Sequence, residues 1–105
     1  MGKTYRDLIV WQKAVDLAVD IYTLTELFPK SELYGFVSQM RRTAISIASN
    51  IAEGKLRSRD KEFKRFLEIA FGSGGELETQ IVIAKRISHL ANFSYAAIEA
   101  QKLSW

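Results

Sequence analysis

The sequence predicts an all-α protein of four helices, the last of them short. Apolar residues recur at spacings of three and four along most of the chain, which is the helical period. Pro29 is the only proline. No stretch keeps the apolar–polar alternation of a strand, and no hairpin signal occurs. A length of 105 residues fits a single domain, residues 1–105.

The first helix is expected over residues 7–28, because Asp7 can cap its start and Pro29 disfavours helix in the preceding residue. Two apolar stripes run along it. One stripe comprises Leu8, Trp11, Val15, Ala18 and Tyr22, and the other comprises Val10, Ala14, Leu17, Ile21, Leu24 and Phe28. One apolar face normally suffices against a core. Two stripes therefore predict burial against the chain's own core and against another subunit.

The second helix is expected over residues 31–54, with Ser31 as its N-cap and Gly54 as its C-terminal cap. Its apolar residues have the spacing of a bundle seam: Leu33, Val37, Met40, Ala44, Ile47 and Ile51. A polar stripe faces either solvent or a buried or inter-subunit network. Buried polar groups need partners, so such a network would fix the register. Its members would be Arg42, Ser46, Asn50 and Glu53.

The third helix is expected over residues 58–90, with Ser58 as its cap. The run Gly72-Ser73-Gly74-Gly75 lies in its middle, where each glycine costs about 1 kcal/mol relative to alanine. These glycines mark either a loop between two helices or close-packing points within one. The apolar phase continues through them, which favours one helix. A fourth helix over residues 94–104 would be marginal unless it is docked.

The positive charge is concentrated in one segment. Residues 55–65 contain six basic and two acidic residues, whereas the remaining chain has nine basic and ten acidic ones. Such a cluster indicates either a polyanion-binding patch or an ordinary solvated helix start. The candidate nucleic-acid-binding residues are Arg41, Arg42, Lys55, Arg57, Arg59, Lys61, Lys64, Arg65, Lys85 and Arg86.

Catalytic and metal-binding patterns are weak. The chain has no cysteine, and His89 is its one histidine. Glu76 and Glu78 cannot face the same way on a helix, and neither a phosphate-loop nor a nucleophile-elbow motif occurs. We therefore expect no catalytic residues, no metal, no cofactor and no enzymatic activity. Trp11 and Phe66 could stack on bases, but their phase places them in the core.

The chain shows neither an apolar run long enough to span a membrane nor a signal-peptide pattern at its start. We therefore expect no membrane partner and a cytoplasmic location.

Several segments together resemble a known family. They are Tyr5-Arg6-Asp7-Leu8, Trp11-Gln12-Lys13-Ala14, Phe28-Pro29-Lys30, Glu32-Leu33-Tyr34-Gly35, Gln39-Met40-Arg41-Arg42-Thr43-Ala44, Ser46-Ile47, Asn50-Ile51-Ala52-Glu53-Gly54, Glu62-Phe63, Arg65-Phe66-Leu67, Gly72-Ser73 and Glu76-Leu77-Glu78-Thr79-Gln80. In combination they are similar to the bacterial proteins encoded in rRNA intervening sequences, whose relatives are the accessory variability proteins of diversity-generating retroelements.

The resemblance implies an antiparallel up-down four-helix bundle, here with a short fourth helix, that assembles into a pentameric ring. It implies no enzymatic activity. In the retroelement members it implies a basic surface that engages nucleic acid and a reverse transcriptase. This chain departs from the family in carrying Ala48 where proline is common, and Gly74 and Gly75 where bulkier residues are usual. A short fourth helix, native or truncated, would expose part of the bundle core.

Two functions are therefore expected. The first is a non-enzymatic, oligomeric protein that binds structured RNA or other nucleic acid through its basic surface. The alternative is a protein–protein interaction scaffold without a nucleic-acid role, suggested by the excess apolar surface of the first helix.

Overall fold

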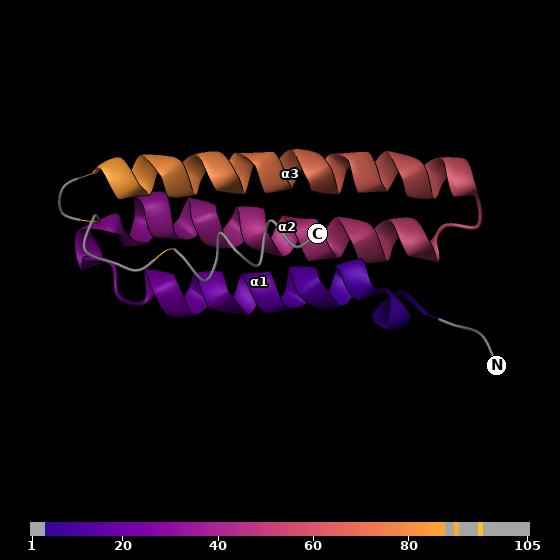
Figure 1. Cartoon of the computed structure of the whole chain (residues 1–105), viewed down its shortest axis with the longest axis horizontal. Coiled ribbons are helices and arrows are strands. Elements are labelled where there is room, and N and C mark those ends of the chain that lie inside the picture. Colours follow the sequence, from indigo (N-terminus) through magenta and orange to yellow (C-terminus); the bar gives the residue numbers. More distant parts are fainter. Residues whose placement is uncertain (1–3, 88–89, 91–94, 96–105) are drawn as a thin grey trace.

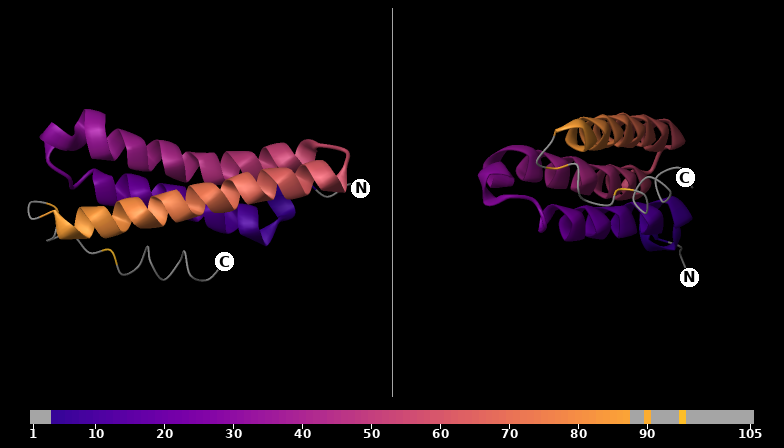
Figure 2. Two further views of the ribbon diagram at one scale, coloured as in Figure 1. Left: turned by 90° about the horizontal axis from the view of Figure 1, so that it is seen from above. Right: turned by 60° about the vertical axis from the view of Figure 1, so that its left-hand side comes forward.

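In the part of the chain that the structure describes, three long helices lie side by side, and the molecule is elongated, at 49 × 20 × 20 Å. The computed structural model describes residues 4–87, 90 and 95, and within them we find α1 (Ile9–Thr25), α2 (Ser38–Leu56), α3 (Asp60–Arg86) and no strand. Figure 1 shows α2 between α1 and α3, and Figure 2 shows from two further sides that the helices run nearly along one direction. The predicted all-α fold is confirmed over these residues.

The core lies along the inner faces of the three helices. Apolar stripes at helical spacing supply it, as expected for helices that each bury one face. Leu90 and Tyr95, which follow α3, are also buried in this cluster, and the Tyr95 hydroxyl donates to the Leu90 carbonyl at 2.9 Å. The other main members are Ala14, Leu17, Ile21, Leu24, Phe28, Val37, Met40, Ala44, Ile47, Ile51, Ala70, Leu77, Ile81 and Ala84.

The start of α1 differs from the prediction. Thr4 and Asp7 form a reciprocal capping box around the short 3₁₀ helix η1 (Tyr5–Asp7), in which Asp7 Oδ2 accepts from the Thr4 N–H at 2.9 Å. The Asp7 carboxylate therefore accepts from the residue before η1 and does not cap α1. Leu8 occupies the N-cap of α1, without a side-chain hydrogen bond. The predicted span of 7–28 was too long at both ends, because the chain passes into turns after Thr25.

The connection from α1 to α2 also corrects the prediction. It contains the 3₁₀ helix η2 (Lys30–Glu32) and a π-helical turn, η3 (Leu33–Val37), which leads directly into α2. Ser31 lies inside η2 and caps nothing. Five of the six predicted seam residues are buried, namely Val37, Met40, Ala44, Ile47 and Ile51. The sixth, Leu33, is exposed, because the wider π turn breaks the helical phase.

One uninterrupted helix, α3, runs through the glycine-rich segment, which confirms the single-helix prediction. It begins at Asp60, with Arg59 rather than Ser58 at its N-cap, and ends at Arg86 rather than residue 90. Asp60 and Glu62 lie in its first turn, where carboxylates favour the positive end of the helix dipole. His89 and the predicted fourth helix, residues 94–104, lie outside the described residues.

Gly54 is a close-packing point between α2 and α3. We predicted a C-terminal cap here, but the helix continues to Leu56 and Gly54 is buried within it. A Cβ at this position would lie 2.6 Å from the Phe66 Cβ and 3.1 Å from the Phe63 Cδ1. The missing side chain therefore allows the two backbones to approach.

Substitution of glycine should have opposite effects at two kinds of position. Gly54→Ala should lower the free energy of unfolding by up to about 2 kcal/mol, because overpacking outweighs the gain in helix propensity. Gly72→Ala and Gly75→Ala are matched controls, since an added Cβ meets nothing within 4 Å. Each should raise stability by about 0.5–1 kcal/mol. Urea unfolding measures all three, and a Gly54→Ala protein as stable as the controls would contradict the close contact.

Candidate nucleic-acid interface

The α2–α3 turn gathers six of the ten predicted binding residues at one end of the molecule. Only residues 57–59 separate the two helices, so the last turn of α2 and the first turns of α3 lie together at the right of Figure 1. All six side chains are exposed. We call this group the basic end: Lys55, Arg57, Arg59, Lys61, Lys64 and Arg65.

Aromatic rings hold part of the basic end. The Arg57 and Arg65 guanidinium groups lie 5.1 and 4.5 Å from the centroid of the Phe66 ring, and the Lys55 ammonium lies 5.5 Å from the Phe63 ring. Phe66 is buried, which confirms its predicted core role. It also gives two arginines a fixed platform, because cations are attracted to the face of an aromatic ring.

Carboxylates balance the same two arginines in part. Arg57 pairs with Glu53 at 3.2 Å, and Arg65 pairs with Glu62 at 3.4 Å. Both pairs are exposed, so each contributes at most about 1 kcal/mol and yields readily to a stronger anion.

The side chains of Arg59, Lys61 and Lys64 form no ion pair with any residue that the structure describes. They surround the turn from two sides, since Arg59 precedes α3 and the two lysines lie in its first turns. Three such cations beside two ring-stacked arginines produce a local positive potential.

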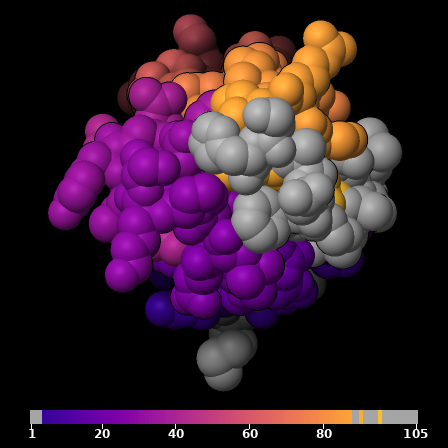
Figure 3. All heavy atoms as spheres, turned by 90° about the vertical axis from the view of Figure 1, so that its left-hand side faces the viewer, coloured from indigo at the N-terminus to yellow at the C-terminus, as the bar shows by residue number. Residues whose placement is uncertain are grey.

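The remaining predicted binding residues lie elsewhere. Lys61 and Arg86 are separated by 25 positions along α3, or about 37 Å at 1.5 Å per residue. Figure 3 shows the opposite end, where the connection between α1 and α2 and the last turns of α3 reach the surface. Lys85 and Arg86 are exposed there. The ten residues therefore do not form a single patch.

Arg41 and Arg42 point in different directions. The Arg41 Nε donates to the Thr25 hydroxyl at 2.9 Å and its Nη2 to the Tyr22 carbonyl at 3.5 Å. Its guanidinium also lies over the Tyr22 ring, at 4.4 Å from the centroid. Arg41 therefore links α2 to α1, whereas Arg42 is exposed.

The predicted polar stripe on α2 divides in two. Ser46 and Asn50 are brought together, because the Asn50 amide donates to the Ser46 carbonyl at 2.8 Å and to its hydroxyl at 3.1 Å. The Ser46 hydroxyl also lies 3.0 Å from that of Ser73 on α3. Arg42 is not joined to this cluster by a hydrogen bond, and Glu53 pairs with Arg57 at the basic end.

Two polar partners on α3 escaped the sequence analysis. Ser73 and Gln80 are seven positions apart, and this spacing on an otherwise apolar face was the available signal. Gln80 is buried, and its Nε2 donates to the Thr43 hydroxyl at 3.2 Å, which itself donates to the Gln39 carbonyl at 2.8 Å. The Ser46–Ser73 and Gln80–Thr43 contacts cross the interface and favour one register of α2 against α3, although the buried Gln80 Oε1 has no hydrogen-bond partner among the described residues.

A double-mutant cycle tests the serine contact. Ser46→Ala and Ser73→Ala should each destabilise the fold, and together they should cost less than the sum of the single changes. The expected coupling is about 0.5–1.5 kcal/mol, the usual net value of a neutral hydrogen bond. Thermal or urea unfolding of the four proteins measures it. Strict additivity would show that the hydroxyls do not interact.

The outer side of α1 has the opposite charge. Between Ile9 and Thr25 it carries Asp16 and Asp20 against Lys13 alone. Burial, and then the nearby Asp16 carboxylate, raise the pKa of Asp20. This face therefore lacks the excess of cations that the basic end carries.

These features define a class of protein: a small helical array with a basic end and a polar seam that fixes helix register. The chain belongs to the family of the 23S rRNA-intervening sequence protein, whose model matches residues 6–103. The comparison with curated proteins gives no match.

Among the described residues, no helix combines the length and apolar character needed to cross a bilayer. In the same part of the chain, no three His, Cys, Asp or Glu side chains are grouped to bind a metal ion.

Proposed function

We propose that this protein is a non-enzymatic, oligomeric accessory factor that binds RNA through its basic end. The observation that supports the proposal most directly is the clustering of Arg59, Lys61 and Lys64, without ion pairs to described residues, around the α2–α3 turn. Lysine and arginine contacts to phosphates supply most of the affinity of such binding, with little dependence on sequence. The family is named for a 23S rRNA intervening sequence, and we therefore choose a structured RNA as the polyanion for the test.

Assembly of several copies would strengthen this binding. The apolar stripe of α1 that begins at Leu8 and Trp11 supports assembly, because Trp11, Val15 and Ala18 are only half-buried and Tyr22 is exposed. Five copies, as the resemblance implies, would raise the formal charge from +3 to about +15, and the surrounding field would grow accordingly. The proposal includes a fourth helix at residues 94–104 that completes the bundle. It also includes a reverse transcriptase as a possible protein partner, by analogy with the retroelement relatives.

Removal of the three unpaired cations should weaken RNA binding. We expect Arg59→Gln/Lys61→Gln/Lys64→Gln to reduce the affinity for a structured RNA by more than tenfold. The slope of log affinity against log salt should decrease by about 2–3, since each phosphate contact contributes about 0.7–0.9. Fluorescence anisotropy at ~50 and ~200 mM salt measures both quantities.

A matched control removes three cations from the other end. Lys30→Gln/Lys85→Gln/Arg86→Gln has the same change in net charge, so a purely global electrostatic effect would affect both variants equally. We expect the control to retain most of the wild-type affinity and salt slope. Equal loss in both variants would contradict a localised interface. Wild-type protein that binds no RNA at low salt would contradict the proposed function itself.

A scaffold that binds only protein is the second candidate. Ile9 and Val19 on α1, and Leu27 in the turn that follows it, are 68, 59 and 61% exposed, which leaves apolar side chains available for contact with a protein partner. Recovery of a stoichiometric protein partner from nuclease-treated lysate, with no RNA binding by the purified protein, would favour this candidate.

A further inference from the structure

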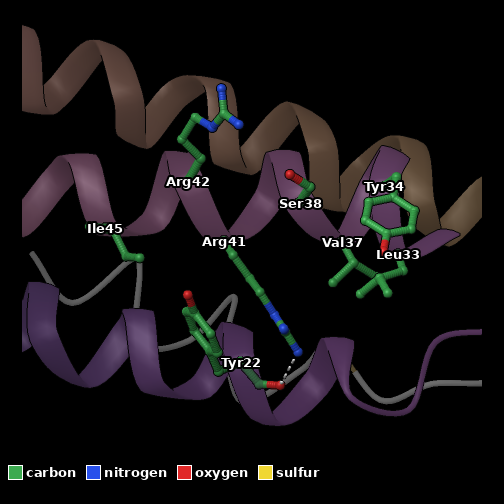
Figure 4. Close-up of a pocket in the computed structure, with 8 residues that line it drawn as sticks. All are labelled: Tyr22, Leu33, Tyr34, Val37, Ser38, Arg41, Arg42 and Ile45. Atoms are coloured by element: carbon green, nitrogen blue, oxygen red, sulfur yellow. Dashed lines mark hydrogen bonds between the residues drawn. The ribbon is translucent and has the colours of Figure 1, made fainter. Parts of the chain in front are cut away.

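An open groove lies where α1, the π turn η3 and α2 meet, on the part of the molecule away from the basic end. Its volume is about 490 Å³, within the range of small-molecule and nucleotide pockets. Tyr22 lies on the α1 side, Leu33 and Tyr34 at one end, and Arg41, Arg42 and Ile45 along α2. Figure 4 shows these side chains and their spread over the three elements.

Arg41 forms a rigid wall of the groove. Its guanidinium is held by the Thr25 hydroxyl and the Tyr22 carbonyl and lies over the Tyr22 ring, and Figure 4 shows it reaching from α2 down to α1. The Tyr22 ring is thereby oriented, while the positive charge of Arg41 remains beside the groove. A wall fixed in this way loses little conformational entropy when a ligand binds.

Tyr34 presents an aromatic ring to solvent at the rim. It is 93% exposed, far more than any other large hydrophobic residue that the structure describes. A ring this exposed contributes almost no hydrophobic stabilisation to the fold, so packing within the chain does not explain why an aromatic residue stands at this position. Arg42 is also exposed, and Figure 4 shows it pointing from α2 away from Arg41. Arg41 therefore lines the groove beside α1, whereas Arg42 lies on the other side of α2, at the rim of the groove.

The lining has one sign of charge. It contains two arginines and no acidic residue, together with two tyrosine rings and aliphatic side chains. An acidic helix would satisfy the charges but not the exposed ring, and an apolar helix would leave the exposed Arg42 without a charged partner. A planar, aromatic and anionic ligand matches every component. Unpaired nucleotides have this chemistry, because a base stacks on tyrosine and the adjacent phosphate pairs with arginine.

We propose that the groove is a stacking subsite for an unpaired base of single-stranded RNA, with Tyr34 as the stacking ring and Arg42 as the contact to the neighbouring phosphate. This inference rests on the proposed function and adds a second contact region to it. Arg42 and Arg57 are 15 positions apart along α2 and its end, or about 22 Å at the helical rise. One flexible strand can therefore reach both the groove and the basic end.

The experiment compares two strands of equal length, an oligoadenylate and an abasic ribose-phosphate strand. Tyr34→Ala should weaken oligoadenylate binding by about 5- to 150-fold, the usual effect of losing one base-stacking ring, and leave the abasic strand unaffected. Tyr34→Phe is the matched control and should bind as wild type, because it keeps the ring. Arg42→Gln should weaken binding of both strands. The exposure of Tyr34 makes unfolding of these variants unexpected, and circular dichroism checks this.

Three results would overturn the inference. Tyr34→Ala that binds oligoadenylate like wild type would show that no base stacks there. Equal loss for the base-bearing and abasic strands would assign Tyr34 a role other than stacking. A change in molar mass of Tyr34→Ala on sedimentation would show that a second copy fills the groove. In each case the triple variant of the basic end still tests the proposed function separately.

Discussion

The close approach of α2 and α3 at Gly54 determines where the charged groups of the basic end lie. With no side chain at residue 54, the α2 backbone can pack against Phe63 and Phe66 at the start of α3. The same Phe66 ring carries Arg57 and Arg65. One packing contact therefore joins the two helices and fixes the platform under the basic end, so a change that separates the helices there would also disperse the arginines.

Polar contacts between α2 and α3 fix the register in which the two helices pack. Apolar seams specify which faces meet but tolerate sliding by a helical turn, whereas a buried hydroxyl or amide tolerates only the register that pairs it. The buried Thr43–Gln80 contact acts in this way, and the half-buried Ser46–Ser73 contact adds to it. They hold α2 and α3 antiparallel in the register that places Gly54 against Phe66. Stability and charge placement consequently depend on the same interface.

The two candidate contact regions differ in physical character. The basic end carries exposed cations, two of which lie on the Phe66 ring, and we propose for it salt-sensitive contacts with phosphates. The groove contains one tyrosine ring held by Arg41 and one exposed tyrosine ring at its rim, and we propose for it an unpaired base. The outer side of α1 carries two aspartates against one lysine and several exposed apolar side chains. Charge and apolar surface are thus distributed unevenly over the described part of the chain.

The sequence by itself determined the helical fold, the buried face of each helix and the location of the excess positive charge. These follow from local periodicity and composition, which need no knowledge of partners in space. It misplaced Gly54 and Ser58 as caps, and it put Leu33 in the seam. A glycine near the end of a helix can be a cap or a close-packing point, and only the position of the neighbouring helix distinguishes the two. A π turn produces no recurring spacing of apolar residues, so the sequence pattern does not reveal it.

Only the tertiary structure showed that the ten predicted binding residues divide between two ends, because residues far apart along a 27-residue helix cannot meet at one surface. It also identified Ser73 and Gln80 as register partners, and it revealed the groove around Tyr34. Contacts between helices depend on their relative rotation and register, and these are set by packing of the whole chain rather than by any local segment.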